Sequence, residues 1–359
     1  MRKSTIFLLI SILCVLFCSG ERTTAAPSWP PEFSLEVQIG NNIWSLDKLY
    51  TPVSEEEVLK LQNIPPVLLA RETLGFRLPL KQKNEWEWGF SYLQTGWVQV
   101  TGESAEFYRD ALENTEPRRY YDLGFSGQRY NRQGLYMVRR WEQAGFELVV
   151  KGDFFLCRNY QEWKGSGLGR LATNADGSRN TGIYGVYSEF LREKDEAPGI
   201  GAALAWEARV RWVSGAGMEL RLANLPGLVW FSRLTKDTKK VDSEGESLGP
   251  VHVTGKKERE TTGIHLPLEA TAIFFQPAGS GLFFFTATAT GMVRDFSAGY
   301  HYPVNEKNTL IAEFNPVMRH LALGWSGPWG NLRLYLDHST AGLFIKGIAF
   351  SVGKDSSAF

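Results

Sequence analysis

The feature that most restricts the fold of this chain is a two-residue alternation of apolar and polar side chains, which starts near Leu74 and recurs almost to the C-terminus. Successive side chains of a β-strand point to opposite faces, so each run predicts a strand with one apolar and one polar face. Counting these runs with the turn signals between them predicts an all-β chain of about 14 antiparallel strands, within a range of about 12 to 16. The pattern is clearest in the runs 86–92, 121–125, 206–212, 218–222, 264–272 and 331–337.

This alternation is compatible with two architectures. In a soluble sheet or sandwich the apolar faces pack together and the polar faces meet water. In a transmembrane β-barrel the apolar faces meet lipid and the polar faces line the lumen. Other features of the sequence have to distinguish between them.

The N-terminus has the layout of a secretory signal peptide. Arg2 and Lys3 precede an apolar run over 6–17, and small residues follow up to Gly20. This predicts a signal peptide over residues 1–20, with cleavage after Gly20 or as late as residue 26. The rest of the chain has no comparable apolar run, so no transmembrane helix is expected.

The cysteines support an exported protein without disulfides. Cys14 and Cys18 lie in the signal segment, which leaves Cys157 alone in the mature chain. An internal disulfide and metal sites of the Cys-x-x-Cys kind are therefore excluded. An alternative for the N-terminus is lipidation at Cys18, because the residues that lead up to it loosely resemble a lipoprotein signal.

Residues 27–72 differ from the remainder and predict a short, partly helical N-terminal segment. Ser54 and Glu57 have the spacing of a capping box, and the helix should end before Pro65. A second short helix is expected over 104–114.

Charge and aromatic content favour the membrane barrel. The 39 Lys and Arg residues are balanced by 39 Asp and Glu residues, which argues against a nucleic-acid partner. Short turns alternate with long polar connections, as in outer-membrane barrels. Aromatic residues also recur near predicted strand ends, where interfacial girdles would place them: Trp97, Trp141, Tyr187, Trp230, Tyr300, Tyr302, Trp325 and Trp329.

With these features the chain resembles bacterial outer-membrane β-barrel proteins over residues 73–353, and it ends in Phe359 as many of them do, after a short tail over 354–359. The resemblance implies a place in the outer membrane of a diderm bacterium, in contact with its lipid, and assembly by the barrel-assembly machinery. The strand number and the segment before the barrel also resemble the FadL-like transport barrels. That likeness implies that residues 27–72 form a plug, in the lumen or on the periplasmic side.

The candidate functional residues are the charged side chains on the polar faces of the predicted strands. Under the barrel interpretation they line the lumen and set the polarity of a solute path. In a soluble sheet they would form ordinary cross-strand ion pairs on a solvated face. The set is Glu207, Arg209, Arg211, Glu219, Arg221, Glu269, Arg333 and Asp337.

No residue pattern predicts an enzyme, a cofactor or a metal site. The five histidines are not spaced as metal ligands, and His265 and His320 are expected to face a polar lumen or solvent. The expected function is passage or binding of small or amphipathic solutes, lipid-like ones included, without covalent chemistry. The alternative is a soluble periplasmic β-rich protein that binds a ligand or a partner. A distant alternative is an outer-membrane lipid hydrolase, because the segment 337–342 slightly resembles a motif of such enzymes, with Asp337 where the motif has its histidine.

Overall fold

A computed structural model describes residues 34–41, 59, 64, 67–83, 85–112, 120–173, 179–243, 252–290, 293–317, 320–328, 330–339 and 342–352. In these residues the elements, in chain order, are β1 (Ser34–Asn41), β2 (Val67–Lys83), β3 (Trp86–Thr101), α3 (Gly102–Leu112), β4 (Tyr121–Gln143), β5 (Phe146–Thr173), β6 (Arg179–Leu191), β7 (Gly199–Arg211), β8 (Gly217–Ser243), β9 (His252–His265), β10 (Glu269–Ala278), β11 (Gly281–Thr290), β12 (Val293–Asn305), β13 (Asn308–Asn315), β14 (His320–Gly327), β15 (Gly330–Ser339) and β16 (Gly342–Val352).

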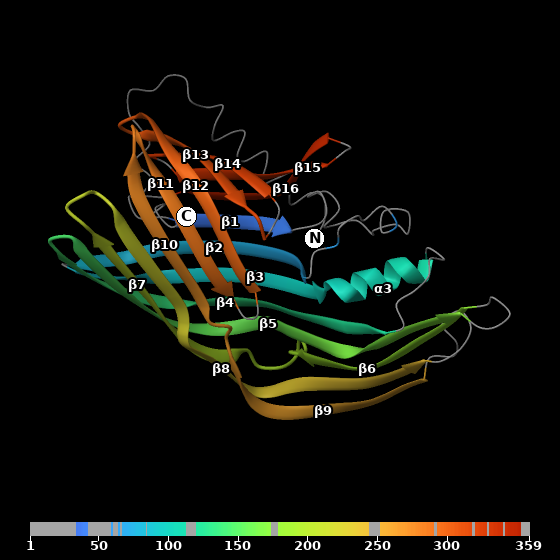
Figure 1. Ribbon diagram of the computed structural model, residues 1–359. Coiled ribbons are helices and arrows are strands. Elements are labelled where there is room, and N and C mark those ends of the chain that lie inside the picture. Colours follow the sequence, from blue (N-terminus) through green and yellow to red (C-terminus); the bar gives the residue numbers. More distant parts are fainter. Residues whose placement is uncertain are drawn as a thin grey trace, which may run out of the picture.

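The strands form one antiparallel sheet that closes on itself (Figure 1). β1 lies between β16 and β2, so the first and last described strands complete the ring. Both β6 and β7 pair with β5 on one side and with β8 on the other, so together they occupy a single position in the wall. β9 and β10 likewise share the position beside β8. The described strands therefore make a closed barrel of 14 strand positions, as the sequence predicted.

The two ends of the barrel differ. The tight connections at 144–145, 279–280 and 306–307 lie at one end, which is also the end where β1 begins and β16 stops. Longer connections, including the one that holds α3, lie at the opposite end. This matches the short-turn and long-loop asymmetry of outer-membrane barrels. We call these ends the turn end and the loop end.

At the loop end, part of the wall rises above the rest. β6 and the far halves of β5, β8 and β9 project beyond the barrel, next to α3 (Figure 1). The projection begins where the wall is irregular, at the breaks 192–198 and 266–268 and at Asn159 and Asn224, which both have positive φ. Behind these irregularities lies a cluster of buried apolar side chains: Tyr130, Phe155, Cys157, Tyr160, Ala203, Val229, Phe231, Leu234 and Leu266.

α3 covers a part of β4 that extends past the end of β3. The Oε2 of Glu103 accepts from the backbone N–H of Asp122 at 2.7 Å, and Oγ of Ser104 accepts from that of Gly124 at 2.9 Å. Side chains at the start of the helix therefore accept from strand N–H groups beyond the last backbone pair with β3. Phe107 then packs edge-on against Tyr121. This helix confirms the one predicted over 104–114.

The polarity of the wall is inverted relative to a soluble sheet. Inward positions hold buried polar residues such as Gln128, Asp153, Glu219 and Asn331. Outward positions hold large apolar side chains that the fold leaves exposed: Leu135, Met137, Phe154, Leu156, Ile200, Met218, Leu220, Phe274, Phe283, Phe285, Phe296, Leu310, Phe314, Leu321, Leu323 and Ile345. No helix in the described ranges is long and apolar enough to cross a membrane.

The N-terminal boundary of the sheet differs from the prediction. The wall includes β1, and β2 begins at Val67, so barrel strands start well before the expected boundary at residue 73. The alternation of Leu35, Val37 and Ile39 is too short, beside a proline-rich stretch, to stand out as a strand in the sequence. The predicted signal peptide, the tail over 354–359 and most of 42–66, where a plug was expected, lie outside the described residues.

Candidate functional site

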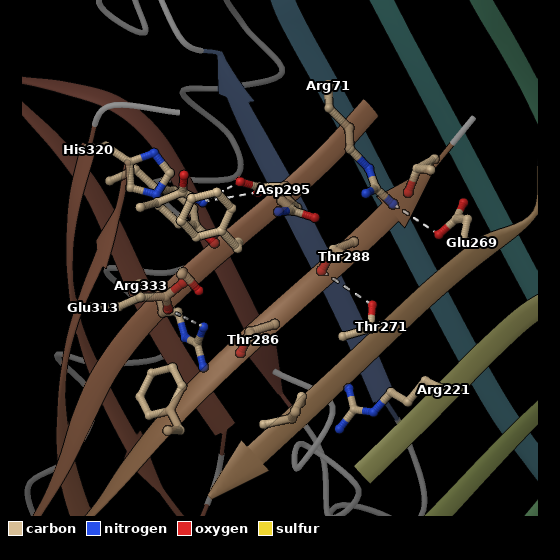
Figure 2. Close-up of a pocket in the computed structure, with 18 of the residues that line it drawn as sticks. Arg71, Arg221, Glu269, Thr271, Thr286, Thr288, Asp295, Glu313, His320 and Arg333 are labelled. Carbon is tan, nitrogen blue, oxygen red and sulfur yellow. Dashed lines mark hydrogen bonds and ion pairs between the residues drawn. The ribbon is translucent and has the colours of Figure 1, made fainter. Parts of the chain in front are cut away.

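The barrel encloses a cavity of about 430 Å³ between β1–β4, β8 and β10–β15. Its wall combines hydroxyl, aromatic and charged side chains. Threonines project from β10 and β11, and Thr271 and Thr288 approach each other with their hydroxyls 3.5 Å apart (Figure 2). Phe275, Phe284 and Tyr335 contribute rings. The site is therefore polar enough to hold water and apolar enough to contact a hydrocarbon group.

Most charged groups in the lining are paired across the lumen wall. Arg71 Nη2 lies 3.3 Å from Glu269 Oε2, and Arg333 Nη1 lies 2.9 Å from Glu313 Oε2 (Figure 2). The second pair is almost fully enclosed by protein. Such pairing offsets part of the desolvation that each charge suffers in the lumen wall.

A larger ion-pair network extends from the cavity toward the turn end. Arg209 Nη2 lies 2.7 Å from Glu219 Oε2, and Nη1 of the same guanidinium lies 3.2 Å from Glu147 Oε2. Arg221 also binds Glu219 and lies 3.9 Å from Glu207 Oε2. The sheet register sets these contacts, since Arg209 is opposite Glu219 and Glu207 is opposite Arg221. We call these five residues the β5–β8 ion network.

β12, β13 and β14 bring a different group of side chains into the cavity. Asn315 Nδ2 donates to both carboxylate oxygens of Asp295, at 2.8 and 3.0 Å. Asn315 is opposite His320 in the register, and the ring of His320 packs edge-on against Tyr335. Six residues from Asp295 along β12, toward the turn end, the ring of His301 lies 4.5 Å from that of Phe284, centroid to centroid.

The structure separates the eight predicted lumen residues into three groups. Glu219, Arg221, Glu269 and Arg333 line the cavity. Glu207 and Arg209 belong to the β5–β8 ion network just beyond it. The remaining two lie elsewhere: Arg211 is exposed at the end of β7, and Asp337 pairs with Lys346 at 2.6 Å in the β15–β16 part of the wall.

Several cavity residues were not singled out from the sequence. Asp295, Asn315 and His301 lie on β12 and β13, where no uninterrupted alternation marks the inward face. The threonines of β11 could have been found, because Thr286, Thr288 and Thr290 alternate with alanines. One expected girdle residue lies inside: Trp97 lines the cavity, whereas Trp230 and Tyr302 are exposed.

The described residues hold no group of three or more His, Cys, Asp or Glu side chains that could bind a metal ion. Of the segment 337–342, Asp337 is the residue whose side chain is described, and its carboxylate pairs with Lys346.

Comparisons with known proteins identify no relative in sequence. No protein-family model matches the chain, and no curated protein matches it. Among solved structures, it is similar to the TodX deltaS2S3 mutant monoaromatic hydrocarbon channel, with 12% identity and a TM-score of 0.43 over 89% of this chain and 88% of that chain. The P. putida toluene transporter TodX gives 11% identity and a TM-score of 0.41 over 89% and 87%. The translocator domain of the autotransporter NalP from Neisseria meningitidis gives 12% and 0.27 over 97% and 93%.

The fold itself confirms the resemblance to outer-membrane β-barrels as a class. The described strands close into a ring, the outer face is apolar and the inner face is polar. Only in lipid does an exposed apolar belt around a closed sheet become favourable.

Proposed function

We propose that this protein is an outer-membrane β-barrel that binds small amphipathic solutes in its lumen and lets them pass, without covalent chemistry. The observation that carries the proposal is the combination of an apolar outer wall with a polar cavity inside a closed sheet.

The membrane location is supported by how polarity changes along the wall. Between the turn end and the break at 192–198, outward residues such as Phe154 (67% exposed) and Ile200 (69% exposed) would be costly in water. The projecting part is different, because β9 carries Lys256, Lys257 and Glu258 in succession and is exposed along most of its length. This part fits water outside the membrane, and the span from the turn end to the breaks at 192–198 and 266–268 fits lipid.

The solute class is supported by the cavity. Its volume is that of a small-molecule site, and it offers threonine hydroxyls beside phenylalanine and tyrosine rings. A solute with an apolar body and a polar group would use both surfaces. A soluble periplasmic protein, the alternative, would have to hide its apolar outer belt from water, and no described element covers that belt.

The experiment combines location, closure and transport. The protein should fractionate with the outer membrane and migrate faster on gels before boiling than after it. Proteoliposomes should take up phenyl β-D-glucoside faster than protein-free liposomes, and a polysaccharide such as inulin should stay outside. Recovery as a soluble periplasmic protein would refute the membrane proposal. A heat-modifiable barrel that admits no glucoside would refute solute passage alone.

A further inference from the structure

The cavity contains one carboxylate without a cationic partner. Its lining has four carboxylates and three guanidinium groups, and the glutamates are each paired with an arginine: Glu219, Glu269 and Glu313 with Arg221, Arg71 and Arg333. The fourth carboxylate, Asp295, is held by the neutral amide of Asn315. Among the described residues, no Lys or Arg forms an ion pair with it.

A second unsatisfied polar group lies beside Asp295. His320 is only 7% exposed and lines the cavity, and its Nε2 has no hydrogen-bond partner within the described parts of the chain. Because Asn315 bonds to Asp295 and is opposite His320 in the register, the three side chains occupy adjacent positions on β12, β13 and β14. In the neutral ring, Nε2 can accept a hydrogen bond from a ligand that also approaches the carboxylate.

Negative charge is also in excess farther down the same lumen. The β5–β8 ion network has three carboxylates, Glu147, Glu207 and Glu219, for the two guanidinium groups of Arg209 and Arg221. Because Glu219 and Arg221 belong to both sets, the cavity lining and the network together hold six carboxylates and four guanidinium groups. A cation that enters would lower the electrostatic free energy of both.

The rings in the lining suit the same ligand. Tyr335 packs edge-on against His320, so an aromatic ring lies beside the histidine that neighbours Asp295. Phe284 and His301 form a second ring pair farther along the lumen, toward the turn end. Aromatic rings attract cations and bury apolar groups. The described residues offer no three-ligand cluster for a metal ion, which leaves an organic cation as the better fit.

We propose that the cavity selects organic cations, with the ammonium group at Asp295 and His320 and an aromatic or aliphatic body against Tyr335. This rests on the proposed function, because it names the substrate class of the lumen cavity. Binding is expected to be modest, since the site is open to water and salt will screen the charge.

The opposite wall of the lumen carries an excess of positive charge, and this excess determines how the proposal is tested. Lys151 Nζ on β5 lies 2.9 Å from Asp153 Oδ2, and the positive charges of Arg77 on β2 and Arg132 on β4 also act on that carboxylate. None of these three cations lines the cavity. The ionic selectivity of the whole pore would therefore average over both walls. Binding of matched probes at the cavity, before and after a change at Asp295, reports on the site itself.

The experiment titrates the folded, detergent-solubilised barrel with three probes of equal size at pH 7: phenethylammonium, 2-phenylethanol and phenylacetate. Phenethylammonium should bind about fivefold more tightly than the alcohol, and phenylacetate should bind most weakly. Asp295→Asn should abolish the preference for the ammonium and leave alcohol binding within about twofold. Glu142→Gln, the same chemical change at an exposed position beside the β4–β5 turn, should have no effect.

The outcomes separate this inference from the proposed function. Equal binding of ammonium and alcohol, or no binding of any probe while proteoliposomes still admit phenyl glucoside, would overturn cation selection and leave solute passage standing. Failure of glucoside uptake would overturn solute passage whatever the probes do. If Asp295→Asn does not give a heat-modifiable barrel, the order of the three probes on the unmodified protein decides the question.

Discussion

At the scale of single residues, close backbone approach fixes the identity of certain glycines. A Cβ built on Gly134 of β4 would meet the backbone oxygen of Phe154 and lie 2.6 Å from the Cα of Phe155. Both are backbone atoms of the paired strand, so the contact is not relieved by a side-chain rotation. Gly152 of β5 is a matched contrast, because a Cβ there would meet only Leu204 Cδ2, at 3.6 Å.

Gly134→Ala should therefore destabilise the barrel by about 1–3 kcal/mol, because the added methyl forces β4 and β5 apart. Gly152→Ala should change stability by less than about 0.5 kcal/mol. The measurement is the urea midpoint of folding into lipid vesicles. Equal midpoints for the two variants would show that β4 and β5 are not held at this separation.

Arg209 holds three carboxylates and has a larger predicted effect. Arg209→Met should destabilise the folded barrel by about 2–4 kcal/mol, because Glu147, Glu207 and Glu219 would lose their shared cation in a partly buried wall. Arg211→Gln, at an exposed position two residues along β7, serves as the control and should lie within about 0.5 kcal/mol of the parent. The same vesicle-folding titration measures both variants. A small loss for Arg209→Met would mean that water already solvates these carboxylates.

At this scale, the sequence predicts which charged side chains face the lumen better than it predicts which of them form ion pairs. Alternation predicts that the side chains of Glu219 and Arg221 face inward. Their contacts, however, depend on the register between β7 and β8, which shifts between Ala203 and Ala205. A shift of this kind has no signature in either strand alone. The same reasoning explains why Asp295 could not be assigned to a site, since its neighbours come from two other strands.

At the scale of elements, the two interrupted strand positions are the unexpected feature. Alternation over 264–272 reads as one continuous strand, yet Leu266 turns into the apolar cluster and separates β9 from β10. The other break, at 192–198, is ordered by its own contacts. Arg192 donates to the backbone oxygen of Ala197, and Glu193 accepts from Lys257 and Arg259 at 2.9 and 3.0 Å.

This contact makes the 192–198 connection sensitive to acid. Hydrogen bonding from Lys257 and then from Arg259 lowers the pKa of the Glu193 carboxyl below its usual value. A lowered pKa means that the tether to β9 is fully present above the usual glutamate pKa and is lost as pH falls through the lowered value. Hydrogen-exchange protection of 192–198, corrected for intrinsic chemical rates, should therefore be high at pH 7 and fall in that acidic range.

Glu193→Gln separates this tether from general acid effects. The variant should show weak protection of 192–198 at pH 7 and little further change on acidification. The β12–β13 turn, remote from Glu193, should respond identically in both proteins. Unchanged protection in Glu193→Gln would show that Arg192 and the local backbone contacts hold the connection without β9.

At the scale of the whole molecule, the fold was predictable because the alternation persists over most of the chain. Strand number and closure follow from a repeated pattern, to which each strand contributes, and single errors at strand ends do not remove it. The place of β1 was not predictable, because closure depends on pairing between segments at opposite ends of the sequence. The cavity forms only because the barrel closes, so its shape could not be predicted from the sequence either.

The inverted polarity gives a test of the whole arrangement. Phe154 lies in the middle of the apolar belt, so Phe154→Arg should reduce the stability of the membrane-inserted barrel by about 2–4 kcal/mol. Val213, fully exposed in the turn between β7 and β8, should accept arginine without measurable loss. Recovery of the unboiled, faster band from outer-membrane fractions measures both. Equal recovery would mean that water, not lipid, surrounds Phe154.

The seam between β1 and β16 also sets an order of events during biosynthesis. Val37 pairs with Phe350, so β1, the first of the described strands, can pair with β2 early but has no partner on its other edge until β16 has been made. Throughout that interval two strand edges offer unpaired N–H and C=O groups to any other nascent chain. The time between the synthesis of β1 and that of β16 increases with every residue between them, and chaperones must protect the chain for the whole of that time.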